Sequence, residues 1–319
     1  MKYSRNPITG CLSSGYRFKF KVPSIDSRTL YLPLEMKTLP SVRQLTQGVS
    51  PLVVFNALDL ADARSRFRSL RKKYDFDYWA VKEYFIQDIL NPDSIVPLRL
   101  NNVQFHVIDI LRKRYFEKKK GRYIISKSFR RCGLTTSIQA YILWMQIYRC
   151  PNNSYVCGRS EINLIPLKRN LCRNLHRDIV PREPWIFLPK VDGRAFFNTF
   201  RNPDFIRGIN LGYVHLANMS QWRDPDDSST SKAYMAPVSA VLLDYFTLVV
   251  IEGDIPHKDR FCIKEYLRNH PHEKEYLRKK KLAHSFYNPF FINEIMVSMT
   301  LKDPHFFYIH INSSLRTPL

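Results

Sequence analysis

The chain has 319 residues, of which 45% are hydrophobic and only 10 are glycine. This composition excludes a largely disordered protein, and the length allows one large or two ordinary domains. Lys and Arg number 50 against 28 Asp and Glu, and the formal net charge of +22 favours a polyanionic partner, above all nucleic acid. The alternative is a protein whose basic charge serves solubility or a ribosome-like assembly.

The sequence argues against a zinc-binding protein, a secreted protein and a membrane protein. The six cysteines include no C-x-x-C pair, which favours reduced thiols in a cytosolic protein, and Cys150 and Cys157 are too far apart for a usual zinc half-site. The N-terminus lacks the apolar core of a secretion signal. Residues 233–251 approach the length of a membrane span, but Pro237 and Asp244 interrupt them, which predicts a helix followed by a buried strand. We therefore expect a cytoplasmic protein without a membrane partner.

The first part of the chain divides into an arm and a helical stretch. Residues 1–60 carry several prolines among mixed polar segments, without strong periodicity, and predict a loosely structured arm. Residues 61–90 predict a helix, because four apolar side chains recur at three- and four-residue spacing. These side chains are Tyr78, Val81, Phe85 and Ile89. A second helix is expected at 103–116, and Gly121 is suited to end it.

The middle of the chain holds its most informative pattern. An apolar run at 123–126 predicts a strand, a basic loop follows it to Gly133, and Thr135 and Thr136 then open an amphipathic helix. A strand, a glycine-containing turn, paired hydroxyls and a helix are the layout of a phosphate-binding loop. The lysine that usually stands between the glycine and the hydroxyl residues is absent, and Leu134 takes its place.

The residues around this turn include the groups that a phosphate site needs. Such a site requires backbone N–H groups aimed at the anion, a cation for the terminal phosphate and a hydroxyl for Mg²⁺. The helix expected at 138–148 would align the amides, and Thr135 or Thr136 can supply the hydroxyl. The nearby cations are Lys127, Arg130 and Arg131. The alternative is a basic strand–helix turn that contacts a phosphate of nucleic acid instead.

Three further short apolar runs predict strands, at 154–157, 211–216 and 246–251. Long connections with helical patterns separate them, which is typical of parallel strands covered by helices. We therefore expect an α/β fold, a mostly parallel sheet with helices on both faces, over residues 95–300. Residues 222–232 predict an exposed loop.

Taken in order, four segments resemble the ATPase domain of phage terminase large subunits, the motors that thread double-stranded DNA into a procapsid. The segments are 97–104, the loop that ends at Gly133, 207–222 and 249–252, and the resemblance extends over residues 75–275. Each motif is degenerate by itself, and the resemblance rests on their order. It implies a P-loop NTPase-like fold.

The resemblance also implies how the chain is organised. The ATPase domain would occupy 61–300, with its core at 95–275, after the arm at 1–60 and before a tail at 301–319. Terminase large subunits usually add an RNase H-like nuclease, but only about 68 residues follow Ile251, too few for that fold. The acidic residues in this part stand mostly beside basic ones, so no nuclease centre is expected.

The resemblance assigns a nucleotide site for ATP and Mg²⁺. Gln104 matches the glutamine that reads the adenine edge, although a helix-surface amide is the alternative. Arg130 stands near the place of the loop arginine, and Lys127 near the place where some members move the phosphate lysine. Thr135 would hold Mg²⁺. The remaining residues of the expected site are Arg131, Gly133, Leu134 and Thr136.

The two catalytic positions of the family are only partly kept. Asn218 stands where most members carry a catalytic glutamate after the second conserved strand, and Glu252 matches the carboxylate of the coupling motif. An amide can hold a water molecule by hydrogen bonds but cannot accept its proton. Because the loop lysine is also missing, the sequence predicts slow or absent hydrolysis with nucleotide binding retained. For Glu252 the alternative is a strand-end carboxylate paired with a local cation.

Basic runs at 112–122 and 278–281, interleaved with aromatic residues, predict contacts with the backbone of double-stranded DNA. The leading hypothesis is therefore a divergent terminase ATPase domain in ATP-linked DNA packaging. A catalytically inactive pseudo-ATPase that binds DNA or serves assembly is the second, and an unrelated basic nucleic-acid-binding protein is the third. The resemblance further implies a procapsid portal and a small terminase subunit as partners, a homo-oligomer, and the cytoplasm of a bacterial host.

Overall fold

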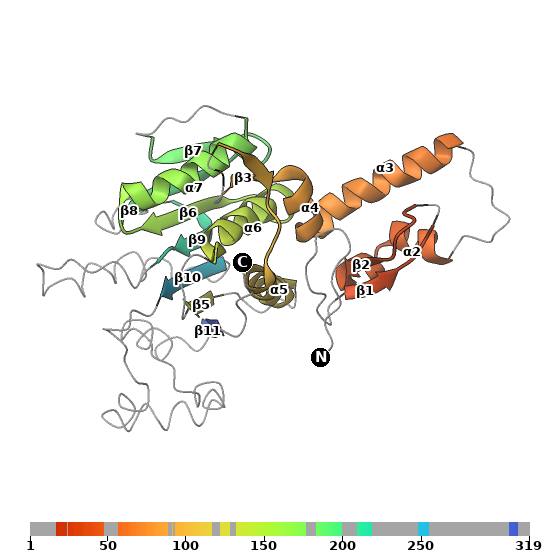
Figure 1. Ribbon diagram of the computed structural model, residues 1–319, viewed down its shortest axis with the longest axis horizontal. Coiled ribbons are helices and arrows are strands. Elements are labelled where there is room, and N and C mark those ends of the chain that lie inside the picture. Colours follow the sequence, from red (N-terminus) through yellow and green to blue (C-terminus); the bar gives the residue numbers. More distant parts are fainter. Residues whose placement is uncertain are drawn as a thin grey trace, which may run out of the picture.

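The computed structural model describes residues 17–23, 25–47, 57–88, 91, 93–116, 122–127, 132–176, 183–199, 209–218, 248–254 and 306–311. These residues form a mixed α/β part and a smaller N-terminal unit, which a long helix connects (Figure 1). Several predictions lie outside the described residues. They concern Gly121, the loop at 222–232, the helix expected before the strand at 246–251, and the basic run at 278–281.

A seven-stranded sheet forms the centre of the larger part, in the order β11-β5-β10-β9-β6-β8-β7. The strands from β11 to β8 are parallel to their neighbours, and β7 runs antiparallel to β8. The predicted mostly parallel sheet is confirmed. The strands are β5 (Arg122–Lys127), β6 (Asn153–Gly158), β7 (Trp185–Leu188), β8 (Gly193–Thr199), β9 (Leu211–Leu216), β10 (Leu248–Asp254) and β11 (Phe306–Ile311).

The four apolar runs predicted as strands are confirmed as parts of β5, β6, β9 and β10. Strands β7, β8 and β11 were not predicted. The last of them corrects the expectation of a C-terminal tail at 301–319, because β11 pairs along the whole of β5, from Phe306 opposite Arg122 to Ile311 opposite Lys127. The physical reason is that β5 would otherwise present an unpaired strand edge.

One face of the sheet carries the core that surrounds the candidate site. Alternate side chains point to opposite faces of a strand, so Tyr123, Tyr213 and Val250 share a face, and they belong to one buried cluster with the helices. Side chains of the opposite parity, such as Val214 and Ile251, are buried as well. A sheet that is apolar on both faces explains why its strands read as continuous hydrophobic runs.

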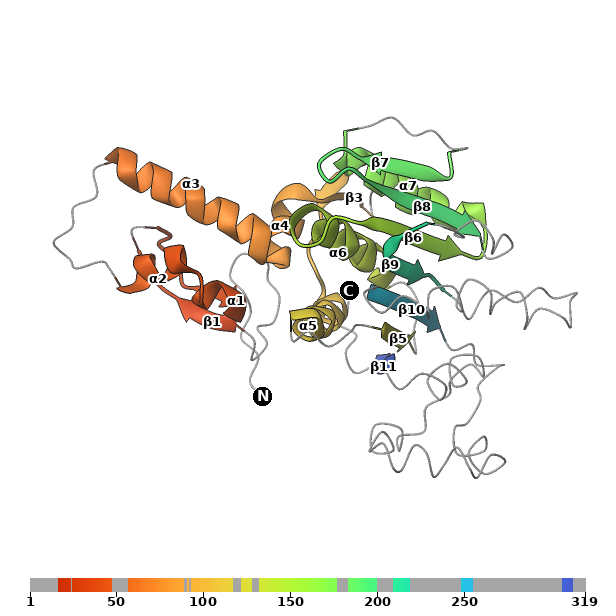
Figure 2. The same cartoon turned by 180° about the vertical axis from the view of Figure 1, so that it is seen from behind.

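The face with Tyr123 and Val250 is covered by α5 (Asn102–Phe116), α6 (Leu134–Tyr148) and α7 (Glu161–Asn174), as Figures 1 and 2 show from two sides. The helices expected at 103–116 and 138–148 are confirmed within α5 and α6. The second is not amphipathic as predicted, because ten of its residues are buried. A helix that is apolar around its circumference lies inside the protein, here between the sheet and its neighbouring helices.

The N-terminal unit contradicts the expectation of a loosely structured arm at 1–60. Strands β1 (Arg17–Phe20) and β2 (Leu30–Pro33) form an antiparallel hairpin, followed by the helices α1 (Leu34–Lys37) and α2 (Pro40–Gln47). Helix α3 (Ala57–Tyr74) completes the unit, and its Phe67 ring stacks on Phe20 at 4.9 Å. Residues at period-seven positions of α3 line this second core, namely Leu60, Ala63, Phe67, Leu70 and Tyr74. The elements before α3 were missed because each of them has only four to eight residues, too few to show a period.

The predicted helical face at 61–90 is wrong at its C-terminal end. Helix α4 (Phe76–Glu83) ends before Phe85, which begins β3 (Phe85–Gln87), paired with β4 (Ile95–Pro97). The backbone at Tyr84 is extended, and its carbonyl accepts a hydrogen bond from the Leu98 amide at 2.8 Å. The tertiary pairing with β4 thus overrides a helical pattern that the apolar residues alone would allow.

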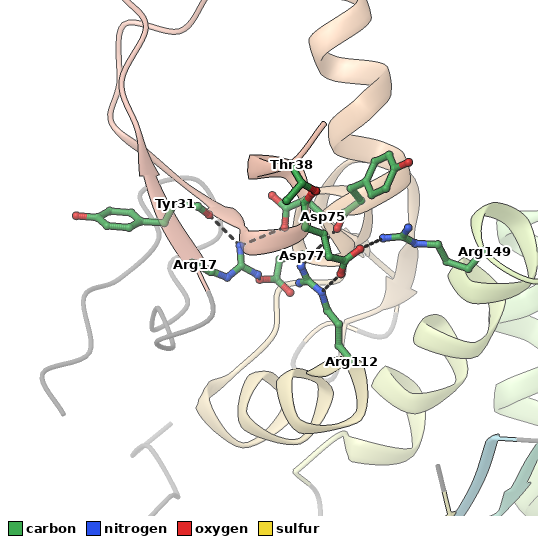
Figure 3. A network of polar contacts seen from close by, with 9 residues as sticks. Arg17, Tyr31, Thr38, Asp75, Asp77, Arg112 and Arg149 are labelled. Atoms are coloured by element: carbon green, nitrogen blue, oxygen red, sulfur yellow. Dashed lines mark hydrogen bonds and ion pairs between the residues drawn. The ribbon is translucent and has the colours of Figure 1, made fainter. Parts of the chain in front are cut away.

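A buried ionic cluster joins strand β1 to the end of α3 and the start of α4 (Figure 3). Arg17 of β1 lies 3.2 Å from the Asp75 carboxylate and also contacts Asp77, while Arg71 of α3 bonds the other Asp75 oxygen at 2.9 Å. Burial by itself raises the pKa of Asp75, but the positive charges of Arg17, Arg71 and Arg112 outweigh it and hold this pKa below its ordinary value of 3.8. Asp75 is therefore ionised in the folded protein at neutral pH.

Glu35 of α1 extends this connection to the helices that cover the sheet. Its carboxylate accepts a hydrogen bond from Arg149 at 2.6 Å and lies 3.6 Å from Arg112. Arg112 belongs to α5, and Arg149 follows the last residue of α6. The N-terminal unit is thus held by ion pairs against the C-terminal parts of both helices.

Asp75→Asn should lower the free energy of unfolding by about 3–5 kcal/mol, because it leaves two buried guanidinium groups without their shared carboxylate. The matched control, Asp62→Asn, removes an exposed carboxylate that is paired with Arg66 on α3 and should cost less than about 1 kcal/mol. Urea unfolding at neutral pH measures both. The depressed pKa also predicts that the difference between wild type and Asp75→Asn shrinks as the pH falls below 3.8, because Asp75 is protonated first in the unfolded chain and only at lower pH in the folded protein. Equal losses in the two variants would contradict a structural role for the cluster.

Candidate functional site

The predicted phosphate-binding turn lies at the carboxyl edge of the parallel sheet. Strand β5 ends at Lys127 and α6 begins at Leu134, so the turn connects the end of a parallel strand to a helix N-terminus. Gly133 is in the left-handed region, with φ of 67°, and precedes the helix without a side-chain cap. The first amides of α6 are therefore free of a capping side chain, which is the arrangement that binds anions at helix N-termini.

The left-handed conformation and the available space both require a glycine at 133. A Cβ atom built on Gly133 would lie 2.5 Å from Nε2 of Gln104, closer than such atoms approach one another. Gln104 is only 6% exposed and donates from Nε2 to the Cys132 carbonyl at 3.1 Å. Asn101 donates to the same carbonyl at 3.0 Å. Two side chains from the start of α5 thus hold the turn in place.

Gln104 has a structural role in addition to the adenine contact that the resemblance implies. Its side-chain Oε1 accepts a hydrogen bond from the backbone N–H of Asn101 at 2.9 Å, and the side-chain Oδ1 of Asn101 accepts one from the backbone N–H of Gln104 at 3.0 Å. This reciprocal pair is a capping box at the N-terminus of α5. The side chain is therefore not the exposed helix-surface amide that was the alternative.

Leu134, at the position of the usual phosphate lysine, is 1% exposed and belongs to the core between the helices and the sheet. Because the side chain at this position points into the core, leucine is suited to it, whereas the ammonium group of a lysine would have to be buried or displaced. The cation of a phosphate site would have to come from elsewhere. Arg130 and Arg131 lie outside the described residues, and of Lys127 only the backbone is described.

A buried polar network lies directly beside the turn. The Thr135 hydroxyl donates to Oε1 of Glu252, whose side chain is fully buried at the end of β10. The same oxygen lies 3.5 Å from Nε2 of His215 on β9, and His215 Nδ1 is 2.6 Å from Nε2 of Gln139 on α6. An amide nitrogen can only donate, so Nδ1 accepts and the histidine proton lies on Nε2, facing Glu252. The network compensates a carboxylate that would otherwise be costly to bury.

Strand register explains why these residues meet. Val250 is opposite His215 in the parallel pair of β10 and β9, and Glu252 is opposite Ile125 in the pair of β10 and β5. His215 and Glu252 therefore share the face that α6 covers. Thr135 and Gln139 are four residues apart, on one side of the helix. Sequence reasoning singled out Thr135 and Glu252 but missed His215 and Gln139.

Asn218 lies in the turn that directly follows β9, with φ of 51°, and it is partly buried. Asparagine tolerates this left-handed conformation better than most residues do. The preceding Ala217 donates to the Cys157 carbonyl at 2.8 Å and so fixes the turn against β6. Because β5, β9 and β10 are parallel, Asn218 stands on the same sheet edge as Thr135 and Glu252. Thr136, the second expected hydroxyl, is half-buried in the first turn of α6.

In nucleotide sites Mg²⁺ is usually bound by only one or two oxygen atoms of the protein, beside the phosphates of the substrate. The oxygen atoms of Thr135 and Glu252 could supply these two ligands. In the described part of the chain, no cluster of three or more histidine, cysteine or acidic side chains is arranged to hold a metal by itself.

Among the residues that the structure describes, no helix has both the length and the apolar character to cross a membrane. Comparison with protein-family models and with curated proteins finds no match to this chain.

The contact between Gly133 and Gln104 can be tested by a double-mutant cycle. Gly133→Ala should cost about 1–2 kcal/mol from the left-handed backbone alone, and more from the clash with Gln104. In a Gln104→Ala background the cost of Gly133→Ala should fall by about 1 kcal/mol, measured by urea unfolding. Gly158→Ala is the control, because its Cβ would meet Leu164 rather than Gln104, and its cost should be the same in both backgrounds.

Proposed function

We propose that this chain is a divergent ATPase domain of the terminase large-subunit type, which binds ATP at the turn Gly133–Thr136 and acts in packaging of double-stranded DNA. The observation that carries the proposal is the hydrogen bond between Thr135 and the buried Glu252. It joins the hydroxyl of the loop helix to a carboxylate on the neighbouring strand, at the edge where ligands bind in parallel α/β sheets.

The sheet order also supports a P-loop NTPase-like fold. The loop strand β5 has β10 on one side and β11 on the other, with β9 beyond β10. The chain leaves β5 through α6 and returns to the sheet at β6, three positions away. A strand order that reverses around the loop strand creates the crevice in which such sheets bind nucleotides.

The residues of the site would bind the phosphates, hold Mg²⁺ and orient the carboxylate of Glu252. The first amides of α6 would hold the phosphates, with cationic help from Lys127, Arg130 or Arg131. Mg²⁺, when bound, supplies charge neutralisation of the phosphate oxygens, and Thr135 with Glu252 would hold it. His215 would keep the Glu252 carboxylate oriented, and Gln139 would fix the histidine tautomer.

Two observations favour the pseudo-ATPase as the second candidate. Leu134 is buried in the core and contributes no charge to the phosphates. Asn218 has an amide where the family has a glutamate, so it can orient a water molecule but cannot take its proton. Both candidates share nucleotide binding and the same expected partners: double-stranded DNA, a procapsid portal, a small terminase subunit and further copies of the chain.

The role of Thr135 can be separated from that of its neighbour Thr136. Titration with a fluorescent ATP analogue, in Mg²⁺ and in EDTA, should show tighter binding with Mg²⁺ for wild type. Thr135→Val should lose this Mg²⁺-dependent gain, about tenfold in Kd, because the hydroxyl beside Glu252 is gone. Thr136→Val removes the adjacent hydroxyl and should change Kd by less than about threefold. Absence of binding in wild type, or equal effects of both variants, would contradict the proposed site.

Asn218 decides between the two candidates. Asn218→Glu should raise ATP-dependent phosphate release by at least about tenfold, because it restores a proton acceptor on the sheet edge. Asn218→Gln is the matched control. Glutamine has the same side-chain length as glutamate and meets the same backbone strain at φ of 51°, but it carries no carboxylate. If the analogue binds to both variants and neither releases phosphate faster than wild type, the chain is a pseudo-ATPase.

A further inference from the structure

A second potential anion site lies in the N-terminal unit. A pocket of about 610 Å³ opens between the turn at 25–28, helix α3 and helix α4. Its charged lining consists of six basic side chains, Arg28, Arg64, Arg68, Arg71, Lys72 and Lys82, and two acidic ones, Asp26 and Glu83. A surplus of positive charge in a concave site attracts an anion.

The pocket's two acidic groups are already engaged by its own cations. Asp26 pairs with Arg28 at 3.1 Å, and Glu83 pairs with Lys72 at 2.6 Å. Arg68 and Lys82 are exposed, and neither has an ion-pair partner among the residues that the structure describes. The acidic residues therefore do not neutralise the pocket.

The arrangement of the cations matches an extended ligand. Arg64, Arg68 and Lys72 recur every fourth residue along one side of α3, at steps of about 6 Å. Ser65 and Ser69 lie beside them on the same helix, and their hydroxyls can donate to phosphate oxygens. Lys82 faces this row from α4. A row of cations with hydroxyl donors is suited to successive phosphates of a backbone.

The aromatic lining argues against a ligand that is recognised through its bases. The Tyr78 ring is covered by the Arg71 guanidinium at 4.0 Å, and Phe67 is buried against Phe20. Single strands and free nucleotides usually gain affinity by stacking on an accessible aromatic ring. Duplex nucleic acid keeps its bases stacked inside and presents only phosphates and sugars to such a surface.

We propose that this pocket binds the phosphodiester backbone of double-stranded nucleic acid, and that the N-terminal unit with α3 is a duplex-binding element. The site is separate from the turn at Gly133, because α3 projects away from the sheet in both views (Figures 1 and 2). The inference rests on the pocket alone and does not require that the chain bind or hydrolyse ATP.

The test uses the full chain, a fluorescein-labelled duplex of about 30 base pairs without nucleotide, and fluorescence anisotropy from about 50 to about 200 mM salt. Arg68→Ala combined with Lys82→Ala should weaken duplex binding by about tenfold and reduce the salt slope by about 1.8, the value for two lost phosphate contacts. The control pair, Arg66→Ala with Lys73→Ala, removes the same charge from α3 outside the pocket lining. It should change affinity by less than about threefold.

The outcomes separate pocket binding from general electrostatic attraction. Equal losses in the two double variants, or no loss in the pocket variant, would overturn the proposal. Tighter binding of a labelled single strand of the same length than of the duplex would overturn it as well. Since all four side chains are exposed, circular dichroism should show folded protein, and Arg68→Gln with Lys82→Gln serves as a second pocket variant. Because the duplex titration contains no nucleotide and changes no residue of the turn at Gly133, failure here is distinct from failure of the nucleotide site.

Discussion

The buried carboxylate of Glu252 is the constraint on which the rest of the site depends. A carboxylate in the protein interior is costly unless polar groups surround it, and here the Thr135 hydroxyl donates to Oε1 while Nε2 of His215 lies 3.5 Å from the same oxygen. These contacts form only while β9, β10 and α6 keep one relative register. A slip of one residue in β10 would turn Glu252 to the opposite face of the sheet. Strand pairing, the start of α6 and the polar chemistry are therefore a single structural requirement.

The turn before α6 is maintained by packing and backbone bonds rather than by a phosphate lysine. Asn101 and Gln104 hold the Cys132 carbonyl, Gly133 supplies the left-handed residue, and Leu134 anchors the helix in the core. Each of these features is made by the chain's own side chains and backbone, so together they hold the turn of the proposed anion site in its shape. Under the proposed function, the two positions that would accelerate hydrolysis carry Leu134 and Asn218 instead of a lysine and a glutamate. Such a division is expected when binding contributes to function more than turnover does.

The sequence predicted the elements whose signals are local. Four buried strands appeared as apolar runs, and the turn at Gly133 was marked by its glycine and its two threonines. Strand β11 was missed because it depends on the distant β5, and β8 depends in the same way on β6, whereas β7 pairs with the adjacent β8. Phe85 was assigned to a helix because its spacing fits one, whereas pairing with β4 decides its conformation. Element type is predictable where a segment's own pattern outweighs its tertiary contacts.

The candidate site shows the same limit more sharply. Thr135 and Glu252 were singled out by type and position, but their contact spans 117 residues of sequence. His215 and Gln139 are 76 residues apart and lie within apolar segments, where a single polar residue carries no signal of its partner. The register of β9 against β10 places His215 in the site, and the contact of Gln139 with His215 Nδ1 adds the second residue. A polar residue inside a predicted buried strand, facing the helix after a glycine turn, is the pattern that would have indicated them.

The two proposed sites are connected through ion pairs and the helices α5 and α6. Glu35 of the N-terminal unit pairs with Arg149 at the end of α6 and lies beside Arg112 on α5. At their other ends, α5 holds the turn through Gln104, and α6 begins at the turn itself. Each helix has 15 residues and is about 22 Å long, so a displacement of the N-terminal unit would act on both ends of the turn at once. Because Glu35 contacts both helices, the N-terminal unit is held against the two helices as a pair.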